Sequence, residues 1–295
     1  MNARIGFLIS ALFIFSSCEK SISFQPGSAE PLVVVEATIE DGEPPVVILS
    51  KSMDYFSEIT PELLAASFIN EAEIEISNGT LTHRLKEYSY ETPEGYRLYY
   101  YSIDSSNLAT AFVGELNTHY SLRIVTGGKE YTATTTIPPL AKTIDSLWWQ
   151  ESTNNPDTTQ VMLMGKVTDP PGFGNYIRYF TSANGEPFYP GLTSAFDDQI
   201  VDGKTYSLQI ERGVNRNEDI DFDTYSYFHR GDTVTVKFAN IDKATYDFWR
   251  TMEYSYGSIG NPFSSPTKVI GNISGGALGY FGGYAVQYIG LKIPE

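Results

Sequence analysis

The residue with the most definite chemistry is Cys18, the only cysteine in the 295-residue chain. A short basic start and an apolar run of eleven residues, 5–15, precede it. That run is too short for a membrane-spanning helix, which needs about 20 residues, and matches a signal-peptide core of roughly 7–15. Ser16 and Ser17 are small enough for a peptidase site, and the thiol that follows suits lipid transfer. We therefore predict a lipoprotein signal peptide over 1–17; the alternative is an ordinary secretory signal.

Lipidation of Cys18 would leave the mature protein attached to a membrane through palmitate-type acyl chains. One acyl chain holds a protein only marginally, at about 0.8 kcal/mol per buried CH₂, whereas a lipoprotein cysteine carries two or three. Since the chain has no second cysteine, an internal disulfide and a zinc–thiolate site are both excluded. Residues 18–30 contain turn formers without a clear period and are expected to be a tether.

A second group with possible chemistry is the alternating set Asp219, Asp221 and Asp223. Carboxylate oxygens at this spacing can wrap a hard cation such as Ca²⁺. The glycine that a calcium loop needs next is replaced by Thr224, and the distal glutamate is replaced by Arg230. A charged strand or solvated loop is the competing interpretation, and Ca²⁺ is the one cofactor that the sequence suggests.

Catalytic motifs are not evident, so we expect a protein that is not an enzyme and has no catalytic residues. His83, His119 and His229 stand singly, without the spacing of metal ligands. No Gly-x-Ser-x-Gly nucleophile elbow occurs. A hydrolase that uses dispersed carboxylates remains as an alternative, because the required separation of two carboxylates cannot be read from a sequence.

The charge and the aromatic content narrow the class of partner. The formal net charge of −16 argues against nucleic acid and against anionic membrane surfaces. It suits solubility, or the capture of cations or cationic peptides. Aromatic residues make up 14% of the chain, including 21 tyrosines, and these are typical of strands as well as of binding surfaces.

The elements expected to position these residues are mostly strands. Asn78-Gly79 predicts a hairpin with a two-residue turn. The pairs expected from it are Ile76 with Leu81, Ile74 with His83, and Ala72 with Leu85. This places His83 on an apolar face, where packing is favoured over ligand binding.

A second hairpin is predicted at Gly127-Gly128, and its pairs would be Ile124 with Tyr131 and Leu122 with Ala133. His119 falls on its polar face. Residues 31–139 are therefore expected to form an antiparallel β-sandwich of immunoglobulin-like size, with a short helical turn near 61–66.

Residues 140–295 are expected to form a second antiparallel β-rich, sandwich-like domain. The strands predicted for it are 144–149, 161–167, 176–180, 205–210, 233–238 and 284–293. One helix is predicted over 241–256, because Ile241, Ala244, Phe248 and Met252 recur at helical spacing, with Asn240 or Asp242 as cap. We interpret this helix as packed on the sheet.

The glycine-rich segment 257–290 allows two interpretations. Glycine permits tight backbone packing, and it also lets a ligand approach the backbone. The aromatic residues in and before this segment are the predicted ligand contacts: Tyr254, Tyr256, Phe263, Tyr280 and Phe281.

The order of several short segments resembles a known family. After the lipidation cysteine these are Leu32 to Ile39, Val46 to Ser50, Tyr120 to Ile124 before a Gly-Gly hairpin, Ile144 to Leu147, Asn261-Pro262-Phe263, Gly271 to Gly276 and Leu278 to Phe281. Together they resemble the domain-of-unknown-function family numbered 4249, lipoproteins of Bacteroidota, over nearly the whole mature chain.

The resemblance implies an outer-membrane location beside a TonB-dependent transporter, because such proteins are often encoded next to one. It supplies no catalytic residues. The residues after Cys18 lack the acidic run that often marks surface export, so the cell-surface and periplasmic faces both stay open. The leading hypothesis is a non-enzymatic lipoprotein that helps the transporter capture an unidentified ligand. The alternative is a structural or adhesive cell-surface module.

Overall fold

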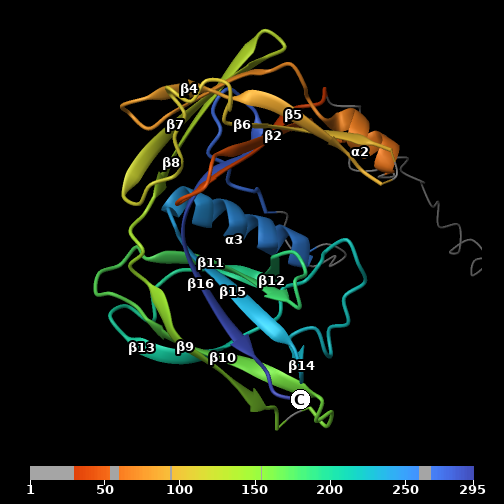
Figure 1. Ribbon diagram of the computed structural model, residues 1–295, viewed down its shortest axis with the longest axis vertical. Coiled ribbons are helices and arrows are strands. Elements are labelled where there is room, and N and C mark those ends of the chain that lie inside the picture. Colours follow the sequence, from red (N-terminus) through yellow and green to blue (C-terminus); the bar gives the residue numbers. More distant parts are fainter. Residues whose placement is uncertain (1–29, 54–59, 94, 154, 259–266) are drawn as a thin grey trace, which may run out of the picture. The chain divides into compact units, whose positions relative to one another are not determined.

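Strands make up most of the regular structure in the part of the chain that the structure describes (Figure 1). The computed structural model describes residues 30–295 apart from 54–59, 94, 154 and 259–266. Within this part the predicted class, mainly β with sandwich-like packing and one packed helix in the second half, is confirmed. Cys18, the predicted signal peptide and all but the last residue of the predicted tether lie outside the described residues.

The largest sheet has eight strands in the order β12-β11-β15-β16-β1-β2-β6-β5. Its strands are β1 (Val33–Glu40), β2 (Val46–Lys51), β5 (Lys86–Glu91), β6 (Arg97–Ser102), β11 (Tyr176–Ala183), β12 (Tyr189–Phe196), β15 (Thr233–Ile241) and β16 (Leu278–Lys292). Strand β16 pairs with β1 in parallel, which the antiparallel prediction did not include. Residues 31–295 form one compact unit, so this pairing links the two predicted domains, and the boundary at 139/140 stays a prediction.

Strand β16 starts inside the glycine-rich segment, six residues before the predicted start, and glycine makes this possible. Gly279 lies opposite Val35 and has a φ of +101°. A Cβ at Gly279 would lie 1.9 Å from the Val35 carbonyl oxygen. Only glycine allows this backbone approach, so the packing interpretation of the segment is confirmed at this position.

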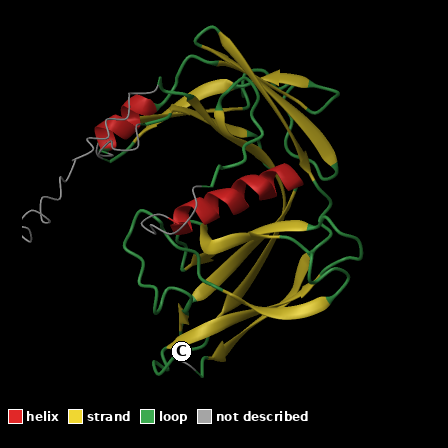
Figure 2. Cartoon of the chain, turned by 180° about the vertical axis from the view of Figure 1, so that it is seen from behind, coloured by secondary structure: helices red, strands yellow, loops and turns green. Residues whose placement is uncertain are grey.

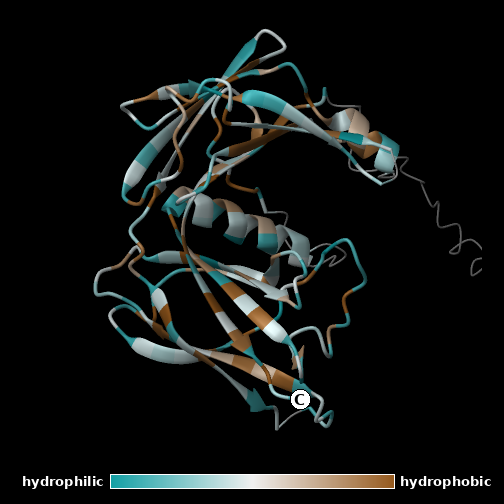
Figure 3. Ribbon diagram, viewed as in Figure 1, coloured by the Kyte–Doolittle hydropathy of each residue, from teal (hydrophilic) through white to brown (hydrophobic). Residues whose placement is uncertain are grey.

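Two four-stranded sheets cover the large sheet, and a core fills each interface. One contains β3 (Glu73–Ser77), β4 (Thr82–Arg84), β7 (Thr118–Thr126) and β8 (Lys129–Ile137); the other contains β9 (Thr143–Glu151), β10 (Gln160–Thr168), β13 (Thr205–Ile210) and β14 (Phe228–His229). The first core joins β3, β7 and β8 to β1, β2 and β16, and the second joins β9, β10 and β13 to β11 and β15. Figure 3 shows hydrophobic and paler residues alternating along β15, as expected for a strand with one face in a core.

Helix α3 (Lys243–Ser258) packs on the large sheet through a third core, which includes Tyr246, Phe248 and Tyr280 (Figure 2). Asp242 caps it, since its Oδ1 accepts the Thr245 N–H at 2.8 Å. The predicted helix and its packing are therefore confirmed, with bounds shifted by two residues. Helix α2 (Pro61–Ser67) occupies the predicted helical turn. Neither described helix is long and apolar enough to cross a bilayer.

The two predicted hairpins differ in outcome. The Gly127-Gly128 hairpin has the predicted register. At Asn78-Gly79 the predicted pairs are wrong: Ile76 lies opposite His83, two residues further on. The Asn78 Oδ1 accepts the N–H groups of Thr80 and Leu81, and this bonding closes a four-residue turn in place of the two-residue one. Because the shift is by two residues, His83 keeps the apolar face that was predicted.

Candidate ligand-binding cavity

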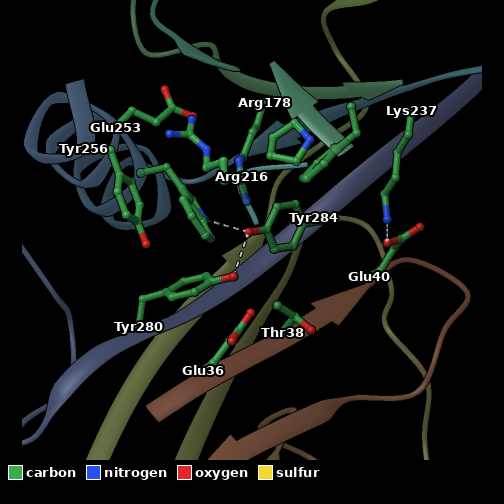
Figure 4. A pocket seen from close by; sticks show the side chains of 13 residues that line it. Glu36, Thr38, Glu40, Arg178, Arg216, Lys237, Glu253, Tyr256, Tyr280 and Tyr284 are labelled. Carbon is green, nitrogen blue, oxygen red and sulfur yellow. Dashed lines mark hydrogen bonds and ion pairs between the residues drawn. The ribbon is translucent and has the colours of Figure 1, made fainter. Parts of the chain in front are cut away.

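A cavity of about 430 Å³ lies between α3, β1 and the β11–β16 part of the large sheet (Figure 4). Charged and aromatic side chains make up most of its wall. The lining residues are Glu36, Thr38, Glu40, Arg178, Phe180, Pro190, Arg216, Lys237, Trp249, Glu253, Tyr256, Tyr280 and Tyr284. Its volume falls within the roughly 300–1,000 Å³ that small-molecule sites occupy.

Element geometry explains why these side chains converge. On β1, Glu36, Thr38 and Glu40 alternate with buried residues of the first core, so they share the opposite face. On α3, Trp249, Glu253 and Tyr256 follow at i, i+4 and i+7, which is one face of a helix. The parallel pairing of β1 with β16 places Tyr280 and Tyr284 next to the β1 carboxylates.

Arg178 is the central cation of this cavity and is only 4% exposed. Its Nε donates to the Ser194 Oγ at 3.1 Å. Its guanidinium carbon lies 3.3 Å from the Trp249 ring centroid and 4.6 Å from that of Phe180. Among the described residues, neither terminal nitrogen of Arg178 has a hydrogen bond or ion pair. A buried guanidinium with open donors is a ready site for an anion.

A chain of hydrogen bonds ends beside Arg178. The Trp249 Nε1 donates to the Tyr284 hydroxyl at 3.1 Å, and that hydroxyl donates to the Tyr280 hydroxyl at 3.3 Å. An indole N–H can only donate, so the Tyr284 hydroxyl accepts from Trp249 and its proton points toward Tyr280. Tyr280 accepts within the chain and keeps its own proton for a further acceptor. Burial raises the pKa of Tyr280, so this hydroxyl stays protonated and able to donate.

The three carboxylates of the cavity differ in their partners. Glu253 accepts from the Ser194 backbone N–H at 3.0 Å and also from the Ser194 hydroxyl. Glu40 forms an ion pair with Lys237. Glu36 has no hydrogen bond or ion pair among the described residues, and it is exposed to solvent at the cavity.

The surroundings of Glu36 change its ionisation. Enclosure by protein raises the pKa of this carboxyl, and the positive charge of Arg178 partly opposes that rise. Glu36 thus feels the charge of Arg178 but has no hydrogen bond or close ion pair of its own among the described residues.

A second cavity, of about 620 Å³, shares Glu36, Trp249, Tyr256 and Tyr280 with the first. Its remaining lining is mainly apolar: Val34, Val35, Phe248, Met252, Val269, Ile273, Ala277 and Leu278, with Lys268 and three glycines. A charged cavity and an apolar cavity with common walls form a site suited to a ligand with a polar end and an apolar end.

The predicted ligand contacts are divided by the structure. Tyr256, 48% exposed, and the buried Tyr280 both line the two cavities. Tyr254, 56% exposed, lines a separate hollow beside α3. Phe281 is fully buried in the first core, where it packs and is closed to solvent. Phe263 lies outside the described residues.

Sequence reasoning missed Arg178, Glu36 and Trp249. The available signal was weak: Arg178 is a single cation within the strand Tyr-Ile-Arg-Tyr-Phe, and Glu36 is one of two glutamates, with Glu40, in the otherwise uncharged β1. A lone charge in a strand that is otherwise apolar indicates a partner or a site, but its location depends on which strands pair.

The predicted calcium ligands do not form a cluster. Asp219, Asp221 and Asp223 are exposed. Asp221 accepts the Asp223 N–H at 3.0 Å and the Thr224 hydroxyl at 2.7 Å, so it stabilises a local turn. Within the described part of the chain, the acidic group close enough to share an ion contains none of these three residues.

That group consists of Asp169, Asp198 and Asp202, and its carboxylates already contact a lysine ammonium and backbone N–H groups of the protein. Asp169 contacts the Lys142 ammonium at 2.9 Å and accepts the Gly203 N–H at 3.1 Å. Backbone N–H groups of residues 172, 174 and 175 donate to Asp198 and Asp202. The cluster therefore acts as a junction between loops.

Two of the histidines occupy the predicted surroundings. His83 is fully buried; its Nε2 accepts the Asp104 N–H at 2.9 Å, which leaves Nδ1 to donate to the Thr110 hydroxyl at 2.9 Å. Burial lowers the pKa of His83, in agreement with a neutral, packed side chain. His119 is exposed on the polar face of its hairpin.

The fold and the cavity define a mainly β protein with a helix-walled cavity lined by charged and aromatic groups. The sequence model for the domain of unknown function DUF4249 matches residues 19–289, and the chain belongs to that family. No curated protein matches the chain.

Proposed function

We propose that this protein is a non-enzymatic lipoprotein of the outer membrane, anchored through Cys18, that captures a small ligand for a TonB-dependent transporter. The anchor rests on the residues around Cys18, and the transporter rests on the family resemblance. The observation that supports ligand capture is Arg178, held by Ser194 and Trp249 in a cavity with its terminal nitrogens open. Burying an arginine without an anion is unfavourable, so a ligand that supplies one gains binding energy there.

The wall of the cavity supports binding by rigid groups. Arg178 is held at Nε by Ser194 and contacts the rings of Trp249 and Phe180, and Glu253 accepts from the Ser194 backbone N–H. Ordering of side chains opposes association, so a site that is ordered before the ligand arrives binds more tightly. This arrangement favours capture of a ligand at low concentration, as expected of a protein that serves a transporter.

The anchor and the partner can be tested together in the organism that carries the chain. Wild-type protein should sediment with outer membranes and, after detergent extraction, co-purify with a TonB-dependent transporter identified by mass spectrometry. Cys18→Ala should leave the membrane fraction while remaining folded, because no disulfide is lost. Ser21→Ala, in the predicted tether, is the matched control and should behave as wild type.

Two results would contradict the proposal. Cys18→Ala protein that stays in the outer-membrane fraction would exclude lipid anchoring at this residue. Wild-type protein that sediments with the membrane but never co-purifies with a transporter, under extraction that keeps other transporter complexes intact, would exclude the accessory role.

A further inference from the structure

We propose that the two joined cavities bind a zwitterion, an amino acid or short peptide whose carboxylate contacts Arg178, whose ammonium contacts Glu36 and whose apolar side chain enters the second cavity. This inference rests on the proposed role of the cavity in ligand capture and names the class of ligand. Most charged groups of the wall already have hydrogen-bond or ion-pair partners, whereas Arg178 and Glu36 have open positions, and the class of ligand follows from this difference.

The carboxylate end is set by Arg178. Its two terminal nitrogens carry parallel N–H groups that match the two oxygens of a carboxylate. Stacking on Trp249 and the bond to Ser194 hold the guanidinium plane, so the direction of these donors is fixed. The free hydroxyl proton of Tyr280 adds a further donor from the neighbouring wall, and Figure 4 shows Tyr280 directed toward the cavity centre.

The ammonium end is set by Glu36, because the other carboxylates have partners. Lys237 is paired with Glu40, and the oxygens of Glu253 accept from Ser194. An ammonium next to Glu36 would compensate the desolvation that raises the pKa of this carboxyl. The cavity therefore has an open cation and an open anion on different walls.

The charged groups of the wall also disfavour a phosphate or another multiply charged anion as the ligand. The Nη2 of Arg216 donates to the Gly191 and Leu192 carbonyl oxygens and its guanidinium lies 5.0 Å from the Tyr256 ring centroid. Since Lys237 is paired as well and Lys268 lines only the second cavity, Arg178 is the cation of the first cavity with both terminal nitrogens open, and Glu36 would repel a dianion there. One positive and one negative group match a zwitterion better.

The apolar part of the ligand is predicted from the shared walls. Trp249, Tyr256 and Tyr280 border both cavities, so a side chain attached near the two charged groups reaches the apolar cavity directly. There it would contact Phe248 and Met252 of α3 and Leu278 of β16. Burial of apolar area stabilises binding by about 25 cal/mol per Å² before the losses of association are subtracted.

The test uses isothermal titration of the purified mature chain, residues 18–295 without lipid, with defined probes. The zwitterions are leucine, Leu-Leu and Leu-Leu-Leu, and their relative affinities distinguish an amino acid from a peptide. N-acetyl-Leu-Leu lacks the ammonium, Leu-Leu amide lacks the carboxylate, and inorganic phosphate represents a simple anion. We expect at least one zwitterion to bind, with each blocked probe weaker by roughly 10- to 100-fold, as expected for loss of one charge-assisted contact.

Variants assign each end of the ligand. Arg178→Gln should weaken Leu-Leu to the level of Leu-Leu amide, and Glu36→Gln should weaken it to the level of N-acetyl-Leu-Leu. Arg97→Gln, on the exposed face of β6, is the matched control and should bind as wild type. Circular dichroism checks folding, and Glu36→Gln together with the probe series decides the question even where Arg178→Gln does not fold.

Three results would overturn the inference: no zwitterion bound at millimolar concentration, equal affinity for blocked and unblocked probes, or phosphate bound more tightly than Leu-Leu. Each would leave the co-purification experiment above unaffected. Failure of the ligand class is therefore distinguishable from failure of the proposed function.

Discussion

The buried ion pair between Lys142 and Asp169 should contribute strongly to the free energy of unfolding. Their side chains are 1% and 0% exposed, and their charged atoms lie 2.9 Å apart. Neither of these two atoms has a hydrogen-bond partner among the described residues, so the opposite charge is the main compensation of each. The other contacts are weaker: the second oxygen of Asp169 accepts the Gly203 N–H, and the Lys142 ammonium lies 5.7 Å from the Tyr206 ring centroid. Lys142→Met would leave the Asp169 carboxylate buried, next to two further carboxylates, without a cation.

Removing one partner of a buried ion pair costs about 3–5 kcal/mol of unfolding free energy. At roughly 2–4 °C per kcal/mol for a chain of this size, Lys142→Met should lower Tm by roughly 6–20 °C. The assay is thermal and urea unfolding followed by circular dichroism. Lys166→Met is the matched control, because Lys166 is exposed on β10, and its unfolding free energy should change by no more than about 0.5 kcal/mol.

A double variant separates loss of the pair from loss of packing. In Lys142→Met/Asp169→Asn no uncompensated charge remains, and the amide oxygen can still accept the Gly203 N–H. The double variant should therefore be more stable than Lys142→Met alone, with a coupling of about 0.5–3 kcal/mol. A Lys142→Met protein as stable as Lys166→Met, or a second substitution that only adds to the loss, would contradict a stabilising ion pair.

Three further predictions concern residues of the core and the cavity. Phe281→Ala should lower the free energy of unfolding in urea by about 3–5 kcal/mol, because the Phe281 ring is fully buried. Tyr254 is exposed, so Tyr254→Ala should change it by at most about 0.5 kcal/mol, and similar losses in the two variants would contradict the placement of both residues. Gly279→Ala should prevent the β1–β16 pairing and abolish cooperative unfolding. Gly276 also has a positive φ but has open space around it, so Gly276→Ala should lower the free energy of unfolding by about 1–2 kcal/mol. A stable Gly279→Ala protein would contradict the register of β1 and β16. Since the pKa of Glu36 is raised in the fold, its contribution to stability is full below its ordinary pKa and is lost as pH rises through the raised value. Because Glu36 is exposed at the cavity, solvent reduces this effect, and Glu36→Gln should raise Tm only slightly at pH 7 and not at about pH 3. A lowered Tm at pH 7 would argue against the raised pKa.

The sequence predicted elements where a local signal decides the structure. The Gly127-Gly128 hairpin follows from turn chemistry, and α3 follows from the helical spacing of apolar residues, so both needed no knowledge of distant contacts. At Asn78 a side-chain acceptor competed with the expected two-residue turn, and composition alone does not weigh these two outcomes. Strand β12 was missed because Pro190 and Gly191 within it resemble a loop.

The candidate site was harder to predict because it depends on contacts between distant segments. Arg178, Trp249 and Glu36 come from β11, α3 and β1, and they meet only because β16 pairs with β1 in parallel. A search for aromatic residues near the C-terminus found Tyr256 and Tyr280 but could not separate them from Phe281. Residues 280 and 281 point to opposite faces of β16, and the faces become known only once the strand pairing is known.

Capture of a ligand in this cavity for a transporter is tested most directly by measuring uptake of radiolabelled Leu-Leu into cells. The cells carry the wild-type chain, Cys18→Ala, Arg178→Gln or the control Arg97→Gln, all at equal protein levels. The proposed function and the inferred ligand class together predict that Cys18→Ala and Arg178→Gln reduce uptake to the level of a deletion strain, while Arg97→Gln retains it. Uptake at the wild-type rate in the Cys18→Ala and Arg178→Gln strains would contradict both the anchor and the cavity as parts of one capture system.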